Sequence, residues 1–245
     1  MAPIEVASRT HIGVSLLFHD PLARDTALPN LLAEVFPQSR PETRTALVNT
    51  ASIQKFGTGQ TMFRQGDSTP VALVMDGHVA IRRTSPDGRQ LIVRIVRRGK
   101  LGAFFPINAR PSAADLVALT PTPVALWAGP WFRSLARSDP GLAVDLLDHV
   151  LITYEEVVGR LDSLIYQDAL RRVARILHLH ADLFFADDPV LTRDYLPTLV
   201  GTSREMTGRV LRILEARSLV ARVGRDRLRL LDPAGLAEAA ADPEP

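Results

Sequence analysis

The sequence of 245 residues contains no cysteine. Disulfide bonds, iron–sulfur clusters, cysteine-ligated zinc and thiol redox switches are therefore excluded. It also has no run approaching the ~20 apolar residues that a membrane-spanning helix needs. The short apolar segment at residues 12–18 has no basic region before it and no small-residue cleavage site close behind it. We therefore expect a cytoplasmic protein with no membrane partner.

The sequence has almost no excess of charge of either sign, because its 29 Lys and Arg residues are balanced by 27 Asp and Glu residues. The net charge of +2 is too small to indicate nucleic-acid binding by itself. The distribution is more informative, since residues 193–229 contain nine arginines and four acidic residues. Such a local excess predicts a surface that faces phosphate groups.

Enzyme motifs are absent as well. The sequence has no glycine-rich phosphate loop, no nucleophile elbow and no paired metal motif. His178 and His180 lie two residues apart on a predicted helix, so their side chains point apart and make a poor metal pair. We predict that the protein is not an enzyme and has neither catalytic residues nor a metal site.

The strongest functional signal lies in residues 191–219. Thr192 is expected to cap a first helix, and Gly201 to end it in the left-handed conformation that glycine adopts readily. Thr202 and Glu205 fit a capping box at the start of a second helix. Two helices joined by a short glycine turn form a helix-turn-helix, whose second helix enters the DNA major groove.

A β-hairpin is predicted after the second helix. Residues 219–223 and 227–231 read as two strands, and alternation places Arg227 and Arg229 on one face. This hairpin corresponds to the wing of a winged helix.

The predicted winged helix-turn-helix domain spans residues 168–235. Asp168 is expected to cap its first helix, over residues 169–183. The tail at residues 236–245 is rich in Ala, Pro and acidic residues, and we expect it to be frayed.

Residues 53–127 have the texture of a β-sandwich or barrel. Short runs of Val, Ile, Leu and Phe are broken by glycine or proline roughly every 8–12 residues. The pairs at 76–77 and 87–88 are Asp-Gly, which predicts hairpin turns. We therefore predict an antiparallel β jelly roll in a sensor-like domain, residues 31–137, which opens with short helices. An amino-terminal extension, residues 1–30, precedes it.

The apolar period becomes helical over residues 138–167. Two positions of a heptad are apolar for roughly three heptads, which predicts a long helix that forms a parallel homodimer. Packing of this helix on its own barrel is the alternative. The predicted dimer seam consists of Leu147, Val150, Tyr154, Val157, Leu161 and Leu164.

The order jelly roll, heptad helix and winged helix, an α+β arrangement, resembles the cyclic-AMP receptor protein and fumarate-nitrate regulator (Crp/Fnr) family of bacterial transcription factors. The resemblance covers roughly residues 31–231. Its most specific part is residues 201–209, GTSREMTGR, which is close to the recognition-helix pattern of the family. The resemblance implies a dimeric, sequence-specific regulator with a cyclic nucleotide-binding-like domain, which binds palindromic promoter DNA and contacts RNA polymerase.

Three side chains match the base-reading positions of this family: Arg204, Glu205 and Arg209. Their spacing places them on one face of a helix. Arginine can bind guanine O6 and N7 with two hydrogen bonds, and glutamate can accept one from cytosine N4. The residues expected to contact DNA phosphates are Arg193, Thr202, Ser203, Arg212, Arg225 and Arg227, with Arg229 of the wing.

One residue departs from the family pattern inside the motif. Pro197 stands where the family prefers alanine or glycine. Proline past the first helical turn removes a backbone hydrogen bond, so we expect a kink that shifts the first helix slightly.

The usual residues that bind cyclic AMP in this family are missing. Members that bind it use a Gly-Glu pair and a later Arg-Ser or Arg-Thr step, but here Ala103 follows Gly102, and Arg110 precedes a proline. Val157 and Val158 replace polar residues that touch the base. We expect no cofactor and no binding of cyclic AMP.

An apolar effector and no effector at all both remain open. The predicted effector pocket consists of Leu101, Gly102, Ala103, Phe104, Phe105, Arg110, Val157 and Leu161. Two alternatives also remain. One is a member of the family that responds to a cyclic nucleotide or to haem, with His11, His19, His78 or His149 as haem ligands. The other is a ligand-binding module that does not bind DNA.

Overall fold

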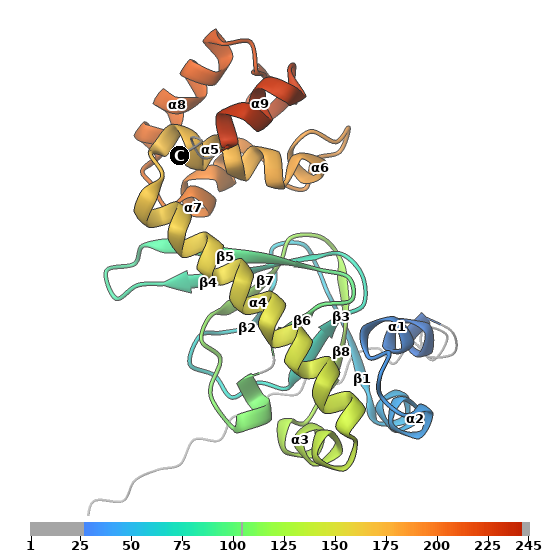
Figure 1. The fold of residues 1–245 in the computed structure, drawn as a ribbon. Coiled ribbons are helices and arrows are strands. Elements are labelled where there is room, and N and C mark those ends of the chain that lie inside the picture. The colour runs from blue at the N-terminus through green and yellow to red at the C-terminus, as the bar shows by residue number, and fades with distance from the viewer. Residues whose placement is uncertain (1–26, 104, 242–245) are drawn as a thin grey trace, which may run out of the picture.

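A computed structural model of the chain describes residues 27–103 and 105–241. It contains an antiparallel β-sandwich with helices on one side, a long helix, and a helical domain with a two-stranded sheet (Figure 1). This order confirms the predicted fold class. No helix within the described ranges is both long enough and apolar enough to span a membrane. His11, His19 and most of the predicted amino-terminal extension lie outside these ranges.

Two four-stranded sheets form the sandwich, and every strand pairing in them is antiparallel. The first sheet contains, in spatial order, β1 (Ser52–Phe56), β8 (Thr122–Trp127), β3 (Val71–Val74) and β6 (Leu101–Ala103). The second sheet contains β2 (Thr61–Phe63), β7 (Asp115–Ala118), β4 (His78–Thr84) and β5 (Gln90–Arg97).

The first sheet is covered on both faces, so side chains that alternate along its strands enter two separate hydrophobic cores. Ala72 and Val74 of β3 face the second sheet, whereas Val71 and Leu73 face the helices on the other side. These helices are α1 (Ala27–Val35), α2 (Pro41–Thr50) and α3 (Gly129–Ser138). The predicted boundary after residue 30 was wrong, because α1 already begins at Ala27 and packs on this sheet.

Only one of the two predicted Asp-Gly hairpins is a hairpin. The turn at 87–88 joins the paired strands β4 and β5, and Gly88 has φ of +82°. The turn at 76–77 instead carries the chain from β3 in the first sheet to β4 in the second. An added Cβ at Gly77 would lie 2.6 Å from Thr120 Oγ1, so close packing as well as its φ of +81° requires glycine.

The long helix α4 (Pro140–Tyr166) runs along the sandwich and reaches the carboxy-terminal domain (Figure 1). Asp139 caps it by accepting a hydrogen bond of 3.0 Å from the Gly141 amide. One turn further, the Asp145 carboxylate accepts bonds from the amides of Gln38 and Ser39, at 3.2 and 3.0 Å. The first turns of α4 are therefore fixed to the α1–α2 connection.

The carboxy-terminal domain begins with α5 (Ala169–Leu179). Asp168 caps this helix as predicted, accepting from the Arg171 amide at 2.9 Å, although the helix ends before the predicted residue 183. The later elements are α6 (Ala181–Phe184), the 3-10 turn η3 (Arg193–Tyr195), α7 (Leu196–Val200), α8 (Arg204–Ala216), β9 (Val220–Val223), β10 (Arg227–Leu230) and α9 (Pro233–Ala240).

The prediction of a frayed tail was wrong for the described part of the tail. Asp232 caps α9 by accepting from the Gly235 amide at 2.9 Å, and Leu236 and Ala240 are buried in the core of the domain. Helix α9 packs against α5. The sequence signal for this helix is Asp232 followed by Pro233, a pair that often begins a helix. The prediction of a frayed tail was based on composition and did not use this signal.

Candidate nucleic-acid interface and effector cavity

The helix-turn-helix turn is built around Gly201. Its φ of +72° and ψ of +43° are left-handed, as predicted, and its amide donates to the Pro197 carbonyl at 3.0 Å. Pro197 lies in the first turn of α7, where backbone N–H groups form no hydrogen bond within the helix, so the missing N–H of proline costs no bond. The predicted kink was therefore wrong. The prediction that Thr192 caps this helix was also wrong, because η3 intervenes and the Thr192 side chain makes no capping bond.

Helix α8 is capped by Ser203 instead of Thr202. Ser203 Oγ accepts a hydrogen bond of 3.1 Å from the Met206 amide. The predicted capping box of Thr202 with Glu205 was one residue out of register. The cap fixes the direction of the first turn of α8, which carries Arg204 and Glu205.

One face of α8 is buried and the opposite face is open. Val210, Leu211 and Leu214 pack in the domain core. The three predicted base readers, Arg204, Glu205 and Arg209, are all exposed. In the same part of the helix, Arg209 Nη2 lies 3.4 Å from Glu205 Oε1, and the two side chains are 59% and 83% exposed. These residues are therefore free to contact a macromolecule in solution.

A basic cavity of about 340 Å³ lies beside the first half of α8. Its charged lining consists of Arg193, Arg204, Arg212, Arg222 and the acidic Asp194. Two residues predicted to contact phosphate, Arg193 and Arg212, are thus brought next to a predicted base reader. A polyanion lying over this cavity would meet an excess of positive charge.

Arg222 of β9 also lines this cavity, although it is not among the predicted DNA contacts. Its Nε atom lies 2.6 Å from Glu215 Oε1 of α8, which ties the wing to the recognition helix. Its place in the arginine-rich segment was the available signal, but its position at the cavity depends on the packing of β9 against α8.

The wing arginines differ in their surroundings. Arg225 and Arg229 are exposed, as an interface with phosphates requires. Arg227 is also exposed, but its guanidinium donates to the Asp187 carbonyl at 3.2 Å and lies 3.9 Å from Asp188. Arg227 therefore holds the wing against the loop before η3.

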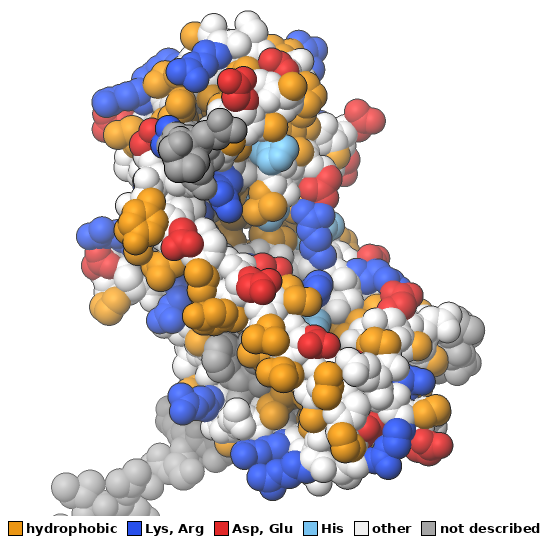
Figure 2. All heavy atoms as spheres, viewed as in Figure 1, with side chains coloured by type: hydrophobic (Ala, Val, Ile, Leu, Met, Phe, Trp, Pro, Cys, Tyr) orange, Lys and Arg blue, Asp and Glu red, His pale blue; other side chains and the backbone are white. Residues whose placement is uncertain are grey.

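The predicted dimer seam forms an apolar strip on α4. The exposed fractions are 55% for Leu147, 43% for Val150, 65% for Tyr154, 40% for Val157 and 53% for Leu161. Figure 2 shows hydrophobic side chains grouped over α4 on this face. Leu164 is half-buried and approaches Gly201, so it contacts the carboxy-terminal domain.

A cavity of about 240 Å³ lies inside the sandwich next to α4. Of the predicted pocket residues, Gly102, Ala103 and Val157 line it. Arg110 and Leu161 are exposed and do not line it, so assigning them to the pocket was wrong.

Leu101 is another predicted pocket residue that does not line the cavity. Leu101 is buried in the core under α1 to α3, because a register shift in the pairing of β3 with β6 places it on the opposite face from Ala103. Phe104 lies outside the described residues, as does the side chain of Phe105.

Arg94 of β5 is a mostly buried cation at this cavity, with its side chain 11% exposed. Its Nη1 atom donates to Thr153 Oγ1 at 2.8 Å, and its Nε atom lies 3.3 Å from Glu156 Oε2. Burial lowers the pKa of Arg94, which Glu156 partly opposes. Arg94 therefore links the sandwich to α4. No sequence pattern marks it, because its surroundings depend on the packing of α4 against β5.

The histidines considered as haem ligands have other surroundings. His149 is buried, and its Nε2 atom accepts a hydrogen bond of 2.9 Å from the Leu101 amide. His78 lies on β4, and burial lowers its pKa. Within the described residues, no group of three His, Cys, Asp or Glu side chains is placed to hold a metal ion.

Comparisons with known families divide the chain in two. Residues 53–139 match the cyclic nucleotide-binding domain, and residues 171–239 match the Crp-like helix-turn-helix domain. Together the two matches cover more than half of the chain, and they fall on the sandwich and the carboxy-terminal domain.

Several known proteins are similar to most of this chain. The chain is 26% identical over 184 residues to the cAMP-activated global transcriptional regulator CRP of Salmonella typhimurium, over 71% of this chain and 87% of that one. It is 27% identical over 182 residues to the cAMP-activated global transcriptional regulator Vfr of Pseudomonas aeruginosa, over 68% and 84%. The crystal structure of a CRP/FNR-family transcriptional regulator from Thermus thermophilus has a TM-score of 0.66 at 24% identity, over 77% of this chain and 98% of that one.

Proposed function

The chain belongs to the Crp/Fnr family of DNA-binding transcription regulators, and on this premise we propose that it acts as a homodimer that reads palindromic promoter sites. The single observation that carries the proposal is the exposed set Arg204, Glu205 and Arg209 on α8, placed after the left-handed turn at Gly201. Such a regulator would work in the cytoplasm and contact RNA polymerase at the promoter. The matched relatives are described as transcriptional regulators.

Base reading would be carried out by α8 in the major groove. The guanidinium groups of Arg204 and Arg209 fit guanine O6 and N7, and the Glu205 carboxylate fits the amino group of cytosine, each pair contributing ~1–3 kcal/mol of discrimination. Glu205 and Arg209 lie one helical turn apart on the same face of α8, with Arg209 Nη2 3.4 Å from Glu205 Oε1. Half-sites rich in G·C pairs follow from this chemistry.

The part of the DNA affinity that does not depend on base sequence would come from the surrounding arginines. Arg193 and Arg212 line the basic cavity beside α8, and Arg225 and Arg229 extend from the wing. Such contacts to phosphates release counterions, so binding is expected to weaken steeply with salt. The Ser203 hydroxyl already caps α8 by accepting from the Met206 amide, so Ser203 would mainly fix the start of α8 beside the DNA backbone.

The dimer axis would run along the exposed apolar strip of α4. Leaving side chains such as Leu147, Tyr154 and Leu161 in water is unfavourable by ~25 cal/mol per Å² of apolar surface, which a second copy would recover. A parallel pair of α4 helices would present two α8 helices to half-sites about 34–36 Å apart.

The effector of this chain would not be cyclic AMP, although the two relatives above are described as cAMP-activated. The cavity of about 240 Å³ is smaller than the roughly 300–1,000 Å³ of most small-molecule sites. Its buried cation, Arg94, is already engaged by Thr153 and Glu156. Much of the lining is apolar, including Ile81, Leu116 and Val157, which favours an apolar effector.

Selection from random double-stranded DNA, followed by a gel shift with excess competitor, tests the DNA-binding part of the proposal. We expect enrichment of a palindrome with G·C-rich half-sites one helical turn apart. Recovery of no common sequence would contradict it and favour a module that binds a ligand or a protein instead.

Calorimetry with cyclic AMP and cyclic GMP tests the effector part, with native mass spectrometry of the purified protein as a second measurement. We expect no heat of binding from either nucleotide, and the mass of a dimer. Saturable binding of cyclic AMP at one site per chain would contradict the proposal about the effector.

A further inference from the structure

The cavity of about 240 Å³ inside the sandwich has a buried hydroxyl in its wall that the fold leaves unsatisfied. Thr69, in the loop between β2 and β3, lines this cavity and is only 7% exposed. Its Oγ1 atom is buried and has no hydrogen-bond partner among the described residues. Buried polar atoms are nearly always satisfied in proteins, so Thr69 marks an incomplete part of the cavity wall.

The position of this hydroxyl is fixed by the chain around it. Thr69 precedes Pro70, and a residue before proline is restricted to extended backbone. Its branched side chain also has few allowed rotamers. The loop before it is tied to another part of the wall, because the Gly66 amide donates to the Ser112 carbonyl and the Ser112 amide to the Asp67 carbonyl, both at 2.8 Å. The Thr69 hydroxyl therefore cannot easily turn toward a partner in the chain.

The other hydroxyls of the lining are engaged. Ser112 Oγ donates to the Ala114 carbonyl at 2.6 Å, and Thr153 Oγ1 accepts from Arg94 Nη1 at 2.8 Å. Within the part of the chain that the structure describes, Thr69 is thus the hydroxyl of this wall whose partner must come from outside the chain.

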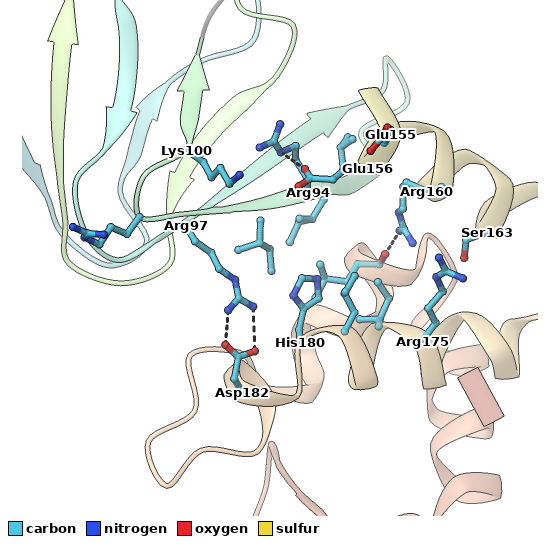
Figure 3. A pocket seen from close by; sticks show the side chains of 18 residues that line it. Arg94, Arg97, Lys100, Glu155, Glu156, Arg160, Ser163, Arg175, His180 and Asp182 are labelled. Carbon is cyan, nitrogen blue, oxygen red and sulfur yellow. Dashed lines mark hydrogen bonds and ion pairs between the residues drawn. The ribbon is translucent and has the colours of Figure 1, made fainter. Parts of the chain in front are cut away.

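The buried charge at the cavity is compensated inside the protein. Arg94 Nε lies 3.3 Å from Oε2 of Glu156 on α4, and Figure 3 shows these two side chains facing each other. Nε itself makes no hydrogen bond, but the carboxylate beside it balances its charge. The second cation of the lining, Arg83, is exposed, so water solvates its charge. A ligand inside the cavity therefore needs no charge of its own.

The rest of the wall is largely apolar. Ile81, Val93, Pro106, Leu116 and Val157 contribute to it. An apolar cavity of ~150 Å³ can bind a molecule of the size of benzene. The volume of about 240 Å³ therefore has room for a ring that carries one small substituent.

We infer the chemical class of the ligand, an inference that rests on the proposed apolar effector. The ligand is a neutral, compact and mostly apolar molecule with one hydrogen-bonding group, which pairs with Thr69 Oγ1 while the apolar body lies against Ile81, Leu116 and Val157. A threonine hydroxyl can both donate and accept, so an alcohol or a carbonyl group satisfies it.

The unsatisfied hydroxyl also makes the cavity selective. A hydrocarbon of the same shape would fill the apolar part but leave Thr69 Oγ1 without a partner. A ligand with a hydroxyl gains that hydrogen bond, and the expected preference is about threefold to tenfold in affinity. A charged ligand loses its hydration without meeting an uncompensated buried charge, so it binds more weakly.

Isothermal titration calorimetry of the full chain tests this assignment, without DNA or cyclic nucleotide, using benzyl alcohol, toluene and benzoate as probes. We expect benzyl alcohol to bind one per chain, toluene to bind about threefold to tenfold more weakly, and benzoate to bind more weakly than benzyl alcohol. Equal affinities for benzyl alcohol and toluene would assign the Thr69 hydroxyl to solvent and overturn the inference. Absence of saturable binding by benzyl alcohol, or a preference for benzoate, would overturn it as well.

The variant Thr69→Val keeps the shape of the side chain and removes its hydroxyl. It should reduce the affinity for benzyl alcohol to that for toluene. It should also raise the Tm of the free protein by ~2 °C, because a buried hydroxyl without a partner is replaced by a methyl group. Thr45→Val, at an exposed position on α2 outside the cavity, is the matched control and should keep the preference. A preference for benzyl alcohol that survives in Thr69→Val would overturn the role of Thr69.

A filled cavity shows where the probes bind. Ala113 lines the cavity and is half-buried, so Ala113→Leu should place its larger side chain in the cavity and abolish binding of both benzyl alcohol and toluene. Unchanged binding in a folded Ala113→Leu variant would overturn the location, and Thr69→Val decides if this variant does not fold. Failure of these titrations leaves the selection of a palindrome untouched, whereas saturable binding of cyclic AMP would contradict the proposed effector itself.

Discussion

The Nε2 atom of His149 accepts a hydrogen bond of 2.9 Å from the backbone amide of Leu101. The bond joins the middle of α4 to β6. The other two residues of β6, Gly102 and Ala103, line the cavity inside the sandwich. Because the acceptor must be an unprotonated nitrogen, the contact exists only with neutral imidazole.

This bond makes stability depend on pH in a defined window. Burial, followed by the charges of Lys100 and Arg94, lowers the pKa of His149 from 6.5 to about 4. Below pH 6.5 the imidazole of His149 is protonated in the unfolded chain but stays neutral in the native chain, so stability falls as the pH drops from 6.5 toward 4, by at most ~3.4 kcal/mol. Above pH 6.5 this residue contributes no pH dependence.

Urea unfolding between pH 7.5 and 4.5 measures this loss. The variant His149→Gln, which keeps a polar side chain without the titration, should show a smaller loss than the wild type. His178→Gln, at an exposed position on α5, should match the wild type. Identical pH profiles for wild type and His149→Gln would contradict the role given to His149.

The cap of α8 is testable by a pair of neighbouring substitutions. Ser203→Ala removes the acceptor of the Met206 amide and should lower the free energy of unfolding by about 1 kcal/mol. Thr202→Ala removes a side chain that caps no helix and should cost clearly less. Chemical denaturation of the two variants decides between them, and a larger loss from Thr202→Ala would restore the capping box at Thr202.

Two glycines of the helix-turn-helix should respond in opposite directions to alanine. Gly201→Ala forces a Cβ into a left-handed conformation, 3.0 Å from Leu164 Cδ2, and should destabilise the chain by at least ~1 kcal/mol. Gly208→Ala lies in the middle of α8 with no atom near the new methyl group, and should stabilise by ~0.5–1 kcal/mol. Thermal unfolding measures both shifts. A stabilising Gly201→Ala would contradict the turn geometry.

The order and nature of the elements could be predicted from sequence periodicity. Alternation over residues 53–127, heptads over residues 138–167 and the glycine turn at Gly201 are local signals, and the structure follows each of them. The predicted cap of α8 at Thr202 was one residue too early, and Pro197 lies in the first turn of its helix instead of beyond it. Errors of this size are expected, because a sequence determines the ends of helices poorly.

The surroundings of the buried charges could not be predicted in this way. Arg94 lies on β5 and its partners Thr153 and Glu156 lie on α4, and only tertiary packing brings them together at the cavity. Leu161 failed as a pocket residue for the same reason, and Leu101 failed because the register shift between β3 and β6 places it on the other face. A strand or helix pattern says that a residue faces one side, but not which partner covers that side.

The apolar strip of α4 predicts a dimer that glutamate should dissociate. The double variant Leu147→Glu with Leu161→Glu places four charges in a two-fold interface and should give monomers in sedimentation equilibrium. Ile152→Glu is the matched control, because Ile152 is also exposed but lies on the opposite side of the helix at 100° per residue. Dissociation by Ile152→Glu alone, or a dimer unaffected by the double variant, would contradict the seam.

The central claim is that exposed side chains of α8 read DNA sequence, and fluorescence anisotropy with the selected palindrome and an unrelated duplex tests it most directly. Arg209→Ala should weaken binding to the palindrome about 10- to 100-fold, the loss expected of one base contact, and leave the unrelated duplex within about twofold. Arg225→Ala, on the wing, should weaken both duplexes alike. Equal losses on both duplexes for Arg209→Ala would contradict base reading by α8.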